Sequence, residues 1–143
     1  MGGTHRLVGR CHCGNVTTVL ETAKPPERLG LRACGCSFCR RHGARTTSDP
    51  EGRARIAVRD PAKLNRYRFN LRSADFLVCR ECGTYVGAVY ADADGAWATL
   101  NANAFEERDV FTQAAAPVAY EAETAEQRAA RRKRQWTPLE GWR

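Results

Sequence analysis

Long apolar runs are missing from this chain of 143 residues, since none approaches the roughly 20 residues that a membrane helix needs. Residues 1–6 carry charge without an apolar stretch behind it, so we expect no secretory signal peptide. Position 6 also lacks the Ser or Thr that N-myristoylation requires. Internal repeats and low-complexity linkers are absent as well. These absences together predict a cytoplasmic protein without a membrane segment.

The composition also lacks the polar and charged excess that keeps a chain disordered. Hydrophobic residues make up 43% of the sequence and charged residues 27%, as in ordinary globular proteins. A chain of this size buries roughly 68–70% of its unfolded surface, which suits one domain rather than two. We therefore predict a single folded domain over residues 1–143.

The positive charge of the chain is spread along it rather than gathered in one place. Lysine and arginine number 23 against 16 acidic residues, which gives a formal net charge of +7. If all the cysteines bound two divalent ions as thiolates, the net charge would fall to roughly +4. Nucleic-acid binding typically needs a basic patch or stripe. A solvated arginine-rich surface is therefore favoured, and nucleic-acid binding is kept as an alternative.

Cysteines are the strongest chemical signal in the sequence. Their number is seven, which is odd and so cannot give a complete set of disulfides. Without a secretion signal the expected compartment is reducing, where cysteine clusters indicate metal or catalytic sites. They stand at positions 11, 13, 34, 36, 39, 79 and 82.

Short β-branched and aromatic segments, separated by Gly and Pro, predict a mostly β fold. The Asp-x-Asp-Gly sequence at 92–95 lies between two such segments and predicts a hairpin. The expected strands are residues 6–10, 15–20, 29–33, 55–59, 65–70, 75–78, 84–90 and 97–101.

Two helical segments are expected. A short helical turn follows the second cysteine cluster, with Ser37 as its N-cap and Gly43 just after its end. A short C-terminal helix is predicted over 125–134, capped by Thr124, with acidic residues before basic ones as the helix dipole favours. We assign its basic residues to a solvated face, and contact with nucleic acid or phosphate is the alternative.

The C-terminal tail carries two aromatic side chains close to a proline. Trp136 and Trp142 flank Pro138, and we expect them to fix the tail against the body of the domain.

Two glycine-terminated cysteine pairs predict a structural zinc site. Cys79 and Cys82 form a Cys-x-x-Cys-Gly knuckle after a strand, and Cys11 and Cys13 form a Cys-x-Cys-Gly pair. Two thiolates in a tight turn supply half of a tetrahedral site, and the glycine permits the left-handed backbone that closes the turn. Joined together, the pairs would make a Cys₄ zinc site that closes a loop of roughly 70 residues.

The remaining cysteines offer three thiolates without a fourth. Cys34, Cys36 and Cys39 match the pattern of a zinc site with an open position, which water or a substrate thiolate could occupy. Arg40 and Arg41 would offset the negative charge and could hold a substrate carboxylate.

Three other interpretations of the cysteines stay open on spacing alone. His42 could close the site as a Cys₃His set, because it lies one helical turn after Cys39. Two of the three cysteines could instead form a redox disulfide. Finally, Cys11 and Cys13 could share a metal with Cys34 and Cys36.

Three segments together resemble the glutathione-dependent formaldehyde-activating enzyme family, which includes centromere protein V. They are residues 9–16 (GRCHCGNV), 34–41 (CGCSFCRR) and 79–84 (CRECGT). The resemblance covers about residues 5–105, with a C-terminal extension over about 106–143. It implies a mostly antiparallel β fold whose sheets are organised around zinc knuckles.

By position, the resemblance implies two zinc ions per chain. Cys11, Cys13, Cys79 and Cys82 match the family's structural zinc ligands. Cys34, Cys36 and Cys39 match its second, substrate-linked zinc.

The activity that the resemblance implies is a carbon–sulfur lyase-like reaction on an S-hydroxymethyl adduct of glutathione or a related thiol. Formaldehyde and the thiol would be the substrates. Tyr85, Tyr90 and His42 are the candidate general acid–base groups. The alternative is a zinc-stabilised module, not an enzyme, that binds nucleic acid or a protein partner through its arginines.

Overall fold

The computed structural model describes residues 4–142, so residues 1–3 and 143 of the predicted domain, and the expectations about the extreme N-terminus, lie outside the described part. The fold is mostly β with two short α-helices, as predicted. None of the helices in the described part is both long and apolar enough to cross a membrane.

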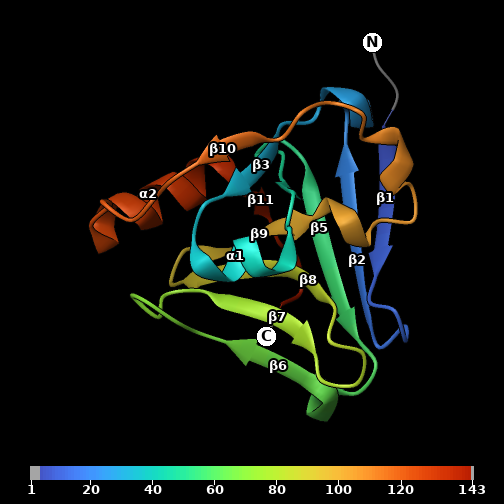
Figure 1. Ribbon diagram of the computed structural model, residues 1–143, viewed down its shortest axis with the longest axis horizontal. Coiled ribbons are helices and arrows are strands. Elements are labelled where there is room, and N and C mark those ends of the chain that lie inside the picture. The colour runs from blue at the N-terminus through green and yellow to red at the C-terminus, as the bar shows by residue number, and fades with distance from the viewer. Residues whose placement is uncertain (1–3, 143) are drawn as a thin grey trace.

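A small antiparallel sheet forms one side of the molecule (Figure 1). It pairs β1 (His5–Arg10) with β2 (Val16–Thr22), and β2 with β5 (Arg53–Val58). Buried residues alternate with partly exposed ones along β2, which is the period of a strand with one face on the core. The turn from β1 to β2 carries the first cysteine pair.

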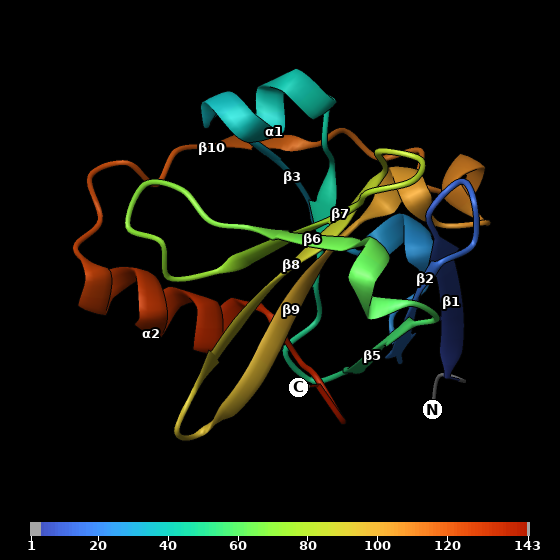
Figure 2. The same ribbon diagram turned by 90° about the horizontal axis from the view of Figure 1, so that it is seen from below.

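A larger sheet of eight strands makes up the rest (Figures 1 and 2). Its order is β10-β3-β4-β9-β8-β7-β6, and β11 pairs with β9 off this path. All its pairs are antiparallel except β10 with β3. The strands are β3 (Leu31–Cys34), β4 (Thr46–Thr47), β6 (Leu64–Tyr67), β7 (Asp75–Cys79), β8 (Tyr85–Asp92), β9 (Gly95–Asn101), β10 (Ala116–Val118) and β11 (Thr137–Pro138).

The main hydrophobic core draws on both sheets. Val16 and Leu20 from the small sheet join Leu77, Val86 and Leu100 from the larger one, and each is at most 1% exposed. Burial of this apolar surface is the main stabilisation of the fold.

Some predicted boundaries were wrong. The predicted strand 65–70 ends at Tyr67, because Asn70 and Arg72 adopt positive φ angles of 57° and 56°, which an extended strand does not allow. Helix α1 (Ser37–His42) is capped by Cys36 rather than Ser37, since the Cys36 sulfur accepts the Cys39 amide. Strands β4, β10 and β11 were not predicted, because each has only two or three residues.

The C-terminal segment folds back onto the larger sheet. Helix α2 (Ala125–Gln135) begins with a capping box in which Thr124 and Gln127 exchange hydrogen bonds, which confirms the predicted cap. Beyond it, Trp136 is 5% exposed and packs against Ala74 and Ala88, and β11 pairs with β9. The predicted attachment of the tail is confirmed, and it fixes the position of α2.

Replacing Trp136 by alanine should therefore lower the free energy of unfolding by about 3–5 kcal/mol, because it removes a large buried ring. Urea denaturation followed by circular dichroism measures this change. Trp142→Ala is the matched control, since Trp142 is only partly buried, and its loss should be smaller. Equal losses in the two variants would contradict this view of the tail.

Candidate metal centres

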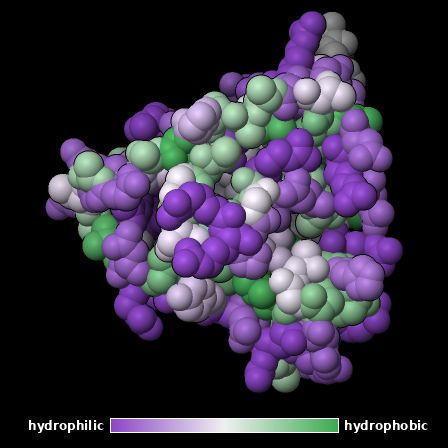
Figure 3. Space-filling model, in the orientation of Figure 1, coloured by the Kyte–Doolittle hydropathy of each residue, from purple (hydrophilic) through white to green (hydrophobic). Residues whose placement is uncertain are grey.

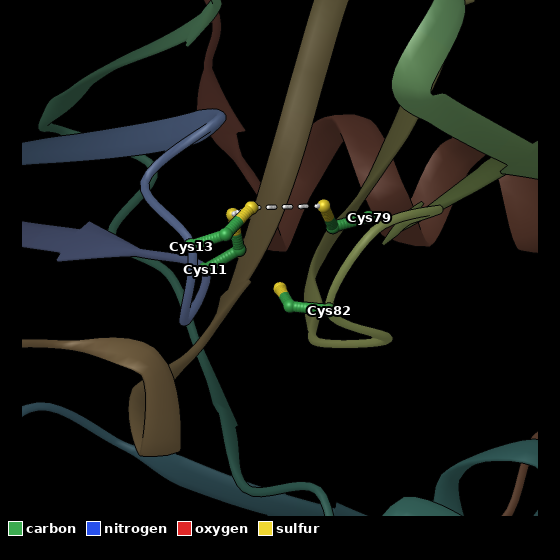
Figure 4. Close-up of side chains that lie close together, drawn as sticks. All are labelled: Cys11, Cys13, Cys79 and Cys82. Atoms are coloured by element: carbon green, nitrogen blue, oxygen red, sulfur yellow. Dashed lines mark hydrogen bonds between the residues drawn. The ribbon is translucent and has the colours of Figure 1, made fainter.

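Four cysteines from two turns that are far apart in the sequence lie close together in the structure (Figure 4). Cys11 and Cys13 come from the β1–β2 turn, Cys79 ends β7, and Cys82 lies in the turn to β8. All four sulfurs lie within 4.8 Å of one another. The Cys13 sulfur is 3.7 Å from that of Cys11 and 3.6 Å from that of Cys79.

These sulfur separations fit a tetrahedral ion. Metal–sulfur bonds of about 2.3 Å at a tetrahedral centre place the sulfurs roughly 3.8 Å apart. Both turns end in a glycine with left-handed backbone, Gly14 at φ 86° and Gly83 at φ 77°, as the motifs predicted. The four-cysteine cluster therefore has the donors and the spacing to hold a metal ion such as zinc.

The sulfurs of this cluster differ in their affinity for a proton. Partial burial opposes ionisation of Cys82, but hydrogen bonds from the Thr84 hydroxyl and nearby backbone amides lower its pKa to about 5. A backbone hydrogen bond from Asn15 favours the Cys13 thiolate, yet contacts with Cys79 and Cys11 raise the pKa of Cys13 to about 11. Neighbouring thiolates repel one another, so all four can ionise at neutral pH only around a cation.

The other three cysteines also form a cluster. Cys34 ends β3, Cys36 caps α1 and Cys39 lies within α1. Their sulfurs lie within 4.8 Å of one another, and the Cys36 sulfur accepts the Cys39 amide at 3.3 Å. Cys39 is 5% exposed, whereas Cys34 and Cys36 are only partly buried.

One arrangement of charge is favoured in the three-cysteine cluster, with Cys34 ionised and Cys39 protonated. A hydrogen bond from Cys39 lowers the pKa of Cys34 to about 5, and the charge of Arg131 adds to this effect. The same hydrogen bond, together with burial, raises the pKa of Cys39. Three close sulfurs therefore hold one negative charge readily and further ones only with a cation among them.

The two clusters differ in access. The three-cysteine cluster lines a pocket, and among the described residues that line this pocket there is no member of the four-cysteine cluster. The pocket is lined by residues of the larger sheet, of α1 and α2, and of the loop 68–74. Figure 2 shows this loop drawn between α1 and α2. Its walls include aromatic side chains from the sheet and from the C-terminal segment, namely Phe69, Phe76, Tyr85, Tyr120 and Trp136.

Four arginines line the same pocket, and the sequence analysis did not place them there. Arg32 comes from β3, and Arg128, Arg131 and Arg132 come from α2. The three on α2 are at most 8% exposed, so their assignment to a solvated face was wrong. Their i, i+3, i+4 spacing, which places all three on one face of a helix, was the available signal.

Of the three candidate acid–base residues, Tyr85 lines the pocket, whereas Tyr90 and His42 do not. Tyr85 is 2% exposed and lines the pocket, and burial raises its pKa. Tyr90 lies outside the pocket, where its hydroxyl donates to Asp92. His42 is exposed and packs against Phe38 in a tilted arrangement, with ring centroids 4.5 Å apart.

Within residues 4–142 no histidine joins either cluster, so the Cys₃His set is not formed. The shuffled pairing is not formed either, since Cys11 and Cys13 lie with the other pair, and all the cysteines are free. Arg40 and Arg41 do not line the pocket, because α1 turns them to the solvent while Cys39 faces inward. The hydrophilic surface over α1 is visible in Figure 3.

Comparison with known proteins adds two findings. A family model described as "Glutathione-dependent formaldehyde-activating enzyme" matches residues 6–123, a range that includes every cysteine and ends before α2. A crystal structure of a Rhodobacter sphaeroides protein is similar at 28% sequence identity and a TM-score of 0.56, covering 78% of this chain and 99% of that one. No curated protein matches the chain.

Proposed function

Because the chain belongs to the glutathione-dependent formaldehyde-activating enzyme family, we propose that it is an enzyme that joins formaldehyde to glutathione or a related thiol, or cleaves the adduct. The product of the forward reaction would be an S-hydroxymethyl adduct of the thiol, which is a hemithioacetal. The reaction centre would be the three-cysteine cluster of Cys34, Cys36 and Cys39.

The observation that carries this proposal is the difference in access between the two clusters. Four sulfurs complete a tetrahedral site and leave no position for a substrate, whereas three sulfurs in a pocket leave one. We therefore assign a structural zinc to the four-cysteine cluster and a second zinc to the three-cysteine cluster. When bound there, zinc would lower the pKa of a substrate thiol so that the thiolate is present at neutral pH.

The residues of the pocket would position the two substrates. A sulfur lone pair forms the new bond to the formaldehyde carbon, while the electron pair of the carbonyl bond moves to oxygen and takes up a proton. Tyr85 is the pocket residue proposed to donate a hydrogen bond to that oxygen, since it lies on the wall beside the cysteines. Phe76 and Trp136 would exclude water and favour capture of the aldehyde.

The alternative of a nucleic-acid module has less support. It needs a basic stripe on the surface, but Arg128, Arg131 and Arg132 are buried against the pocket. Lys133 on the same helix forms ion pairs with Asp92 and Asp94 at 2.6 and 2.7 Å. The positive charge of α2 is thus directed mostly inward or neutralised.

The proposal predicts two zinc ions per purified, reduced chain and faster exchange between formaldehyde, glutathione and their adduct. Metal content by mass spectrometry and exchange rates by nuclear magnetic resonance test both parts. Glutathione titrated into a cobalt-substituted sample should change the absorption of one metal only. One metal per chain, or an exchange rate equal to that of the solution reaction, would contradict the proposed function.

A further inference from the structure

Among the described residues, two of the arginines that line the pocket have no acidic partner, one of them buried (Arg132) and the other partly buried (Arg32). The Arg132 side chain is 6% exposed, donates to the Ser73 hydroxyl at 2.8 Å, and its buried Nε has no hydrogen-bond partner. Arg32 donates to the hydroxyls of Ser48 and Thr99 at 2.5 and 3.1 Å. Hydroxyls satisfy donors but do not neutralise charge, and buried charges are usually paired.

Their neighbours are neutralised within the protein. Arg131 makes a two-pronged ion pair with Glu123, at 2.8 and 3.0 Å, and its guanidinium stacks on Tyr120 at 3.5 Å from the ring centroid. Arg128 also reaches Glu123, at 3.5 Å, and donates to the Tyr120 carbonyl at 2.7 Å. One carboxylate therefore serves two guanidinium groups, and within the described residues no ion pair joins Arg32 or Arg132 to an acidic side chain. The one negative charge that the three-cysteine cluster holds readily still leaves the four arginines in excess.

The remaining acidic group of the pocket does not change this balance. Glu121 lines the pocket but is exposed, and within the described residues it forms no ion pair with the arginines. Burial lowers the pKa of Arg132 to about 10, with further lowering by the charges of Arg131 and Arg128, so it stays protonated at neutral pH. Arg131 lines the same pocket as both Arg32 and Arg132.

Strand β3 carries both one of these arginines, Arg32, and one cysteine of the cluster, Cys34. Arg32 and Cys34 are two residues apart, so their side chains leave the same face of the strand about 6.6 Å apart. A ligand whose sulfur reaches the three-cysteine cluster can therefore extend its other end to the arginines. The guanidinium fork matches a carboxylate in two-pronged geometry.

We infer that Arg32 and Arg132, supported by Arg131, form a carboxylate-binding site that selects an acidic thiol as the substrate of the neighbouring cysteine cluster. This inference rests on the proposed function for the role of the thiol. Arg131 and Arg132 lie on α2, beyond the residues that match the family model, whereas Arg32 lies within them. A thiol without a carboxylate lacks the group that would neutralise the buried charge.

Binding of S-methylglutathione to the metal-loaded protein tests the site without any turnover, since this probe keeps both carboxylates and has no free thiol. Arg132→Gln and Arg32→Gln should each weaken binding by about tenfold or more in titration calorimetry. Arg134→Gln, at an exposed position two residues further along α2, should leave the affinity unchanged. Arg132→Lys keeps the charge but not the fork and should give an intermediate loss.

Equal affinity in Arg32→Gln, Arg132→Lys and wild type, or no binding of the probe to wild type, would overturn the inference even if Arg132→Gln fails to fold. In turnover assays, the two arginine variants should raise KM for glutathione, whereas Arg134→Gln should leave it unchanged. Arginine-dependent binding of the probe without any formaldehyde chemistry would instead reject the proposed function and keep the carboxylate site.

Discussion

The Cys11→Ser variant is expected to lose cooperative folding at room temperature or to melt far below the wild type. Cys11 is fully buried in the turn between β1 and β2, and its sulfur belongs to a cluster that joins this turn to the β7–β8 turn. Structural zinc sites contribute about 10–16 kcal/mol to the folding of small zinc-finger peptides, and a typical domain is stable by only about 5–15 kcal/mol. Losing even part of the free energy that zinc binding contributes to folding is therefore enough to unfold the chain.

Thermal unfolding followed by circular dichroism, with metal content measured on the same samples, checks this expectation. Cys36→Ser is the matched control, because it makes the same chemical change in the other cluster. A strong chelator should act on the wild type as the Cys11 substitution does. A melting temperature like that of the wild type in Cys11→Ser would show that the four-cysteine cluster does not stabilise the fold.

The second large effect is expected at the three-cysteine cluster, where Cys36→Ser should remove activity and leave the fold intact. The Cys36 sulfur caps α1 by accepting the Cys39 amide, and serine is itself a favoured cap residue. The helix start is therefore kept while a metal-binding thiolate is lost. We expect the exchange rate between formaldehyde and glutathione to fall by about a hundredfold or more.

Metal content should fall from two ions to one in this variant, with a melting temperature close to that of the wild type. Ser37→Ala controls for disturbance of the α1 start, since Ser37 is exposed and lies outside the cluster. If Cys36→Ser unfolds, both clusters are structural and the reaction centre must be sought elsewhere. If it keeps full activity, the three-cysteine cluster has no part in the chemistry.

The different effects expected of these two variants follow from where the two clusters lie in the fold. The four-cysteine cluster joins two turns from different sheets, so its loss separates parts of the core. The three-cysteine cluster is built within residues 34–39, where β3 and α1 already hold the sulfurs near one another. Removing one sulfur there disturbs the pocket but not the contact between the sheets.

Features that depend on a few neighbouring residues could be predicted from the sequence. The Cys79 and Cys82 knuckle, the left-handed Gly83 and the Thr124 cap all arise from backbone geometry within one turn. The mostly β fold followed in the same way from alternating and β-branched segments, and the hairpin after Asp92 from its turn residues. Local sterics and hydrogen bonding act over such short stretches whatever the rest of the chain does.

The position of α2 and the direction of its arginines depended on contacts far along the chain. A run of arginines is usually solvated, and only the packing of Trp136 and the pairing of β11 with β9 place Arg132 in the pocket that Cys34 and Tyr85 also line. The cost of burying such a charge depends on the groups around it, such as Glu123 beside Arg131, and these are not neighbours in sequence. The spacing of the cysteines was therefore enough to predict two clusters that could bind metal, while long-range packing decided which charged side chains line the pocket of the three-cysteine cluster.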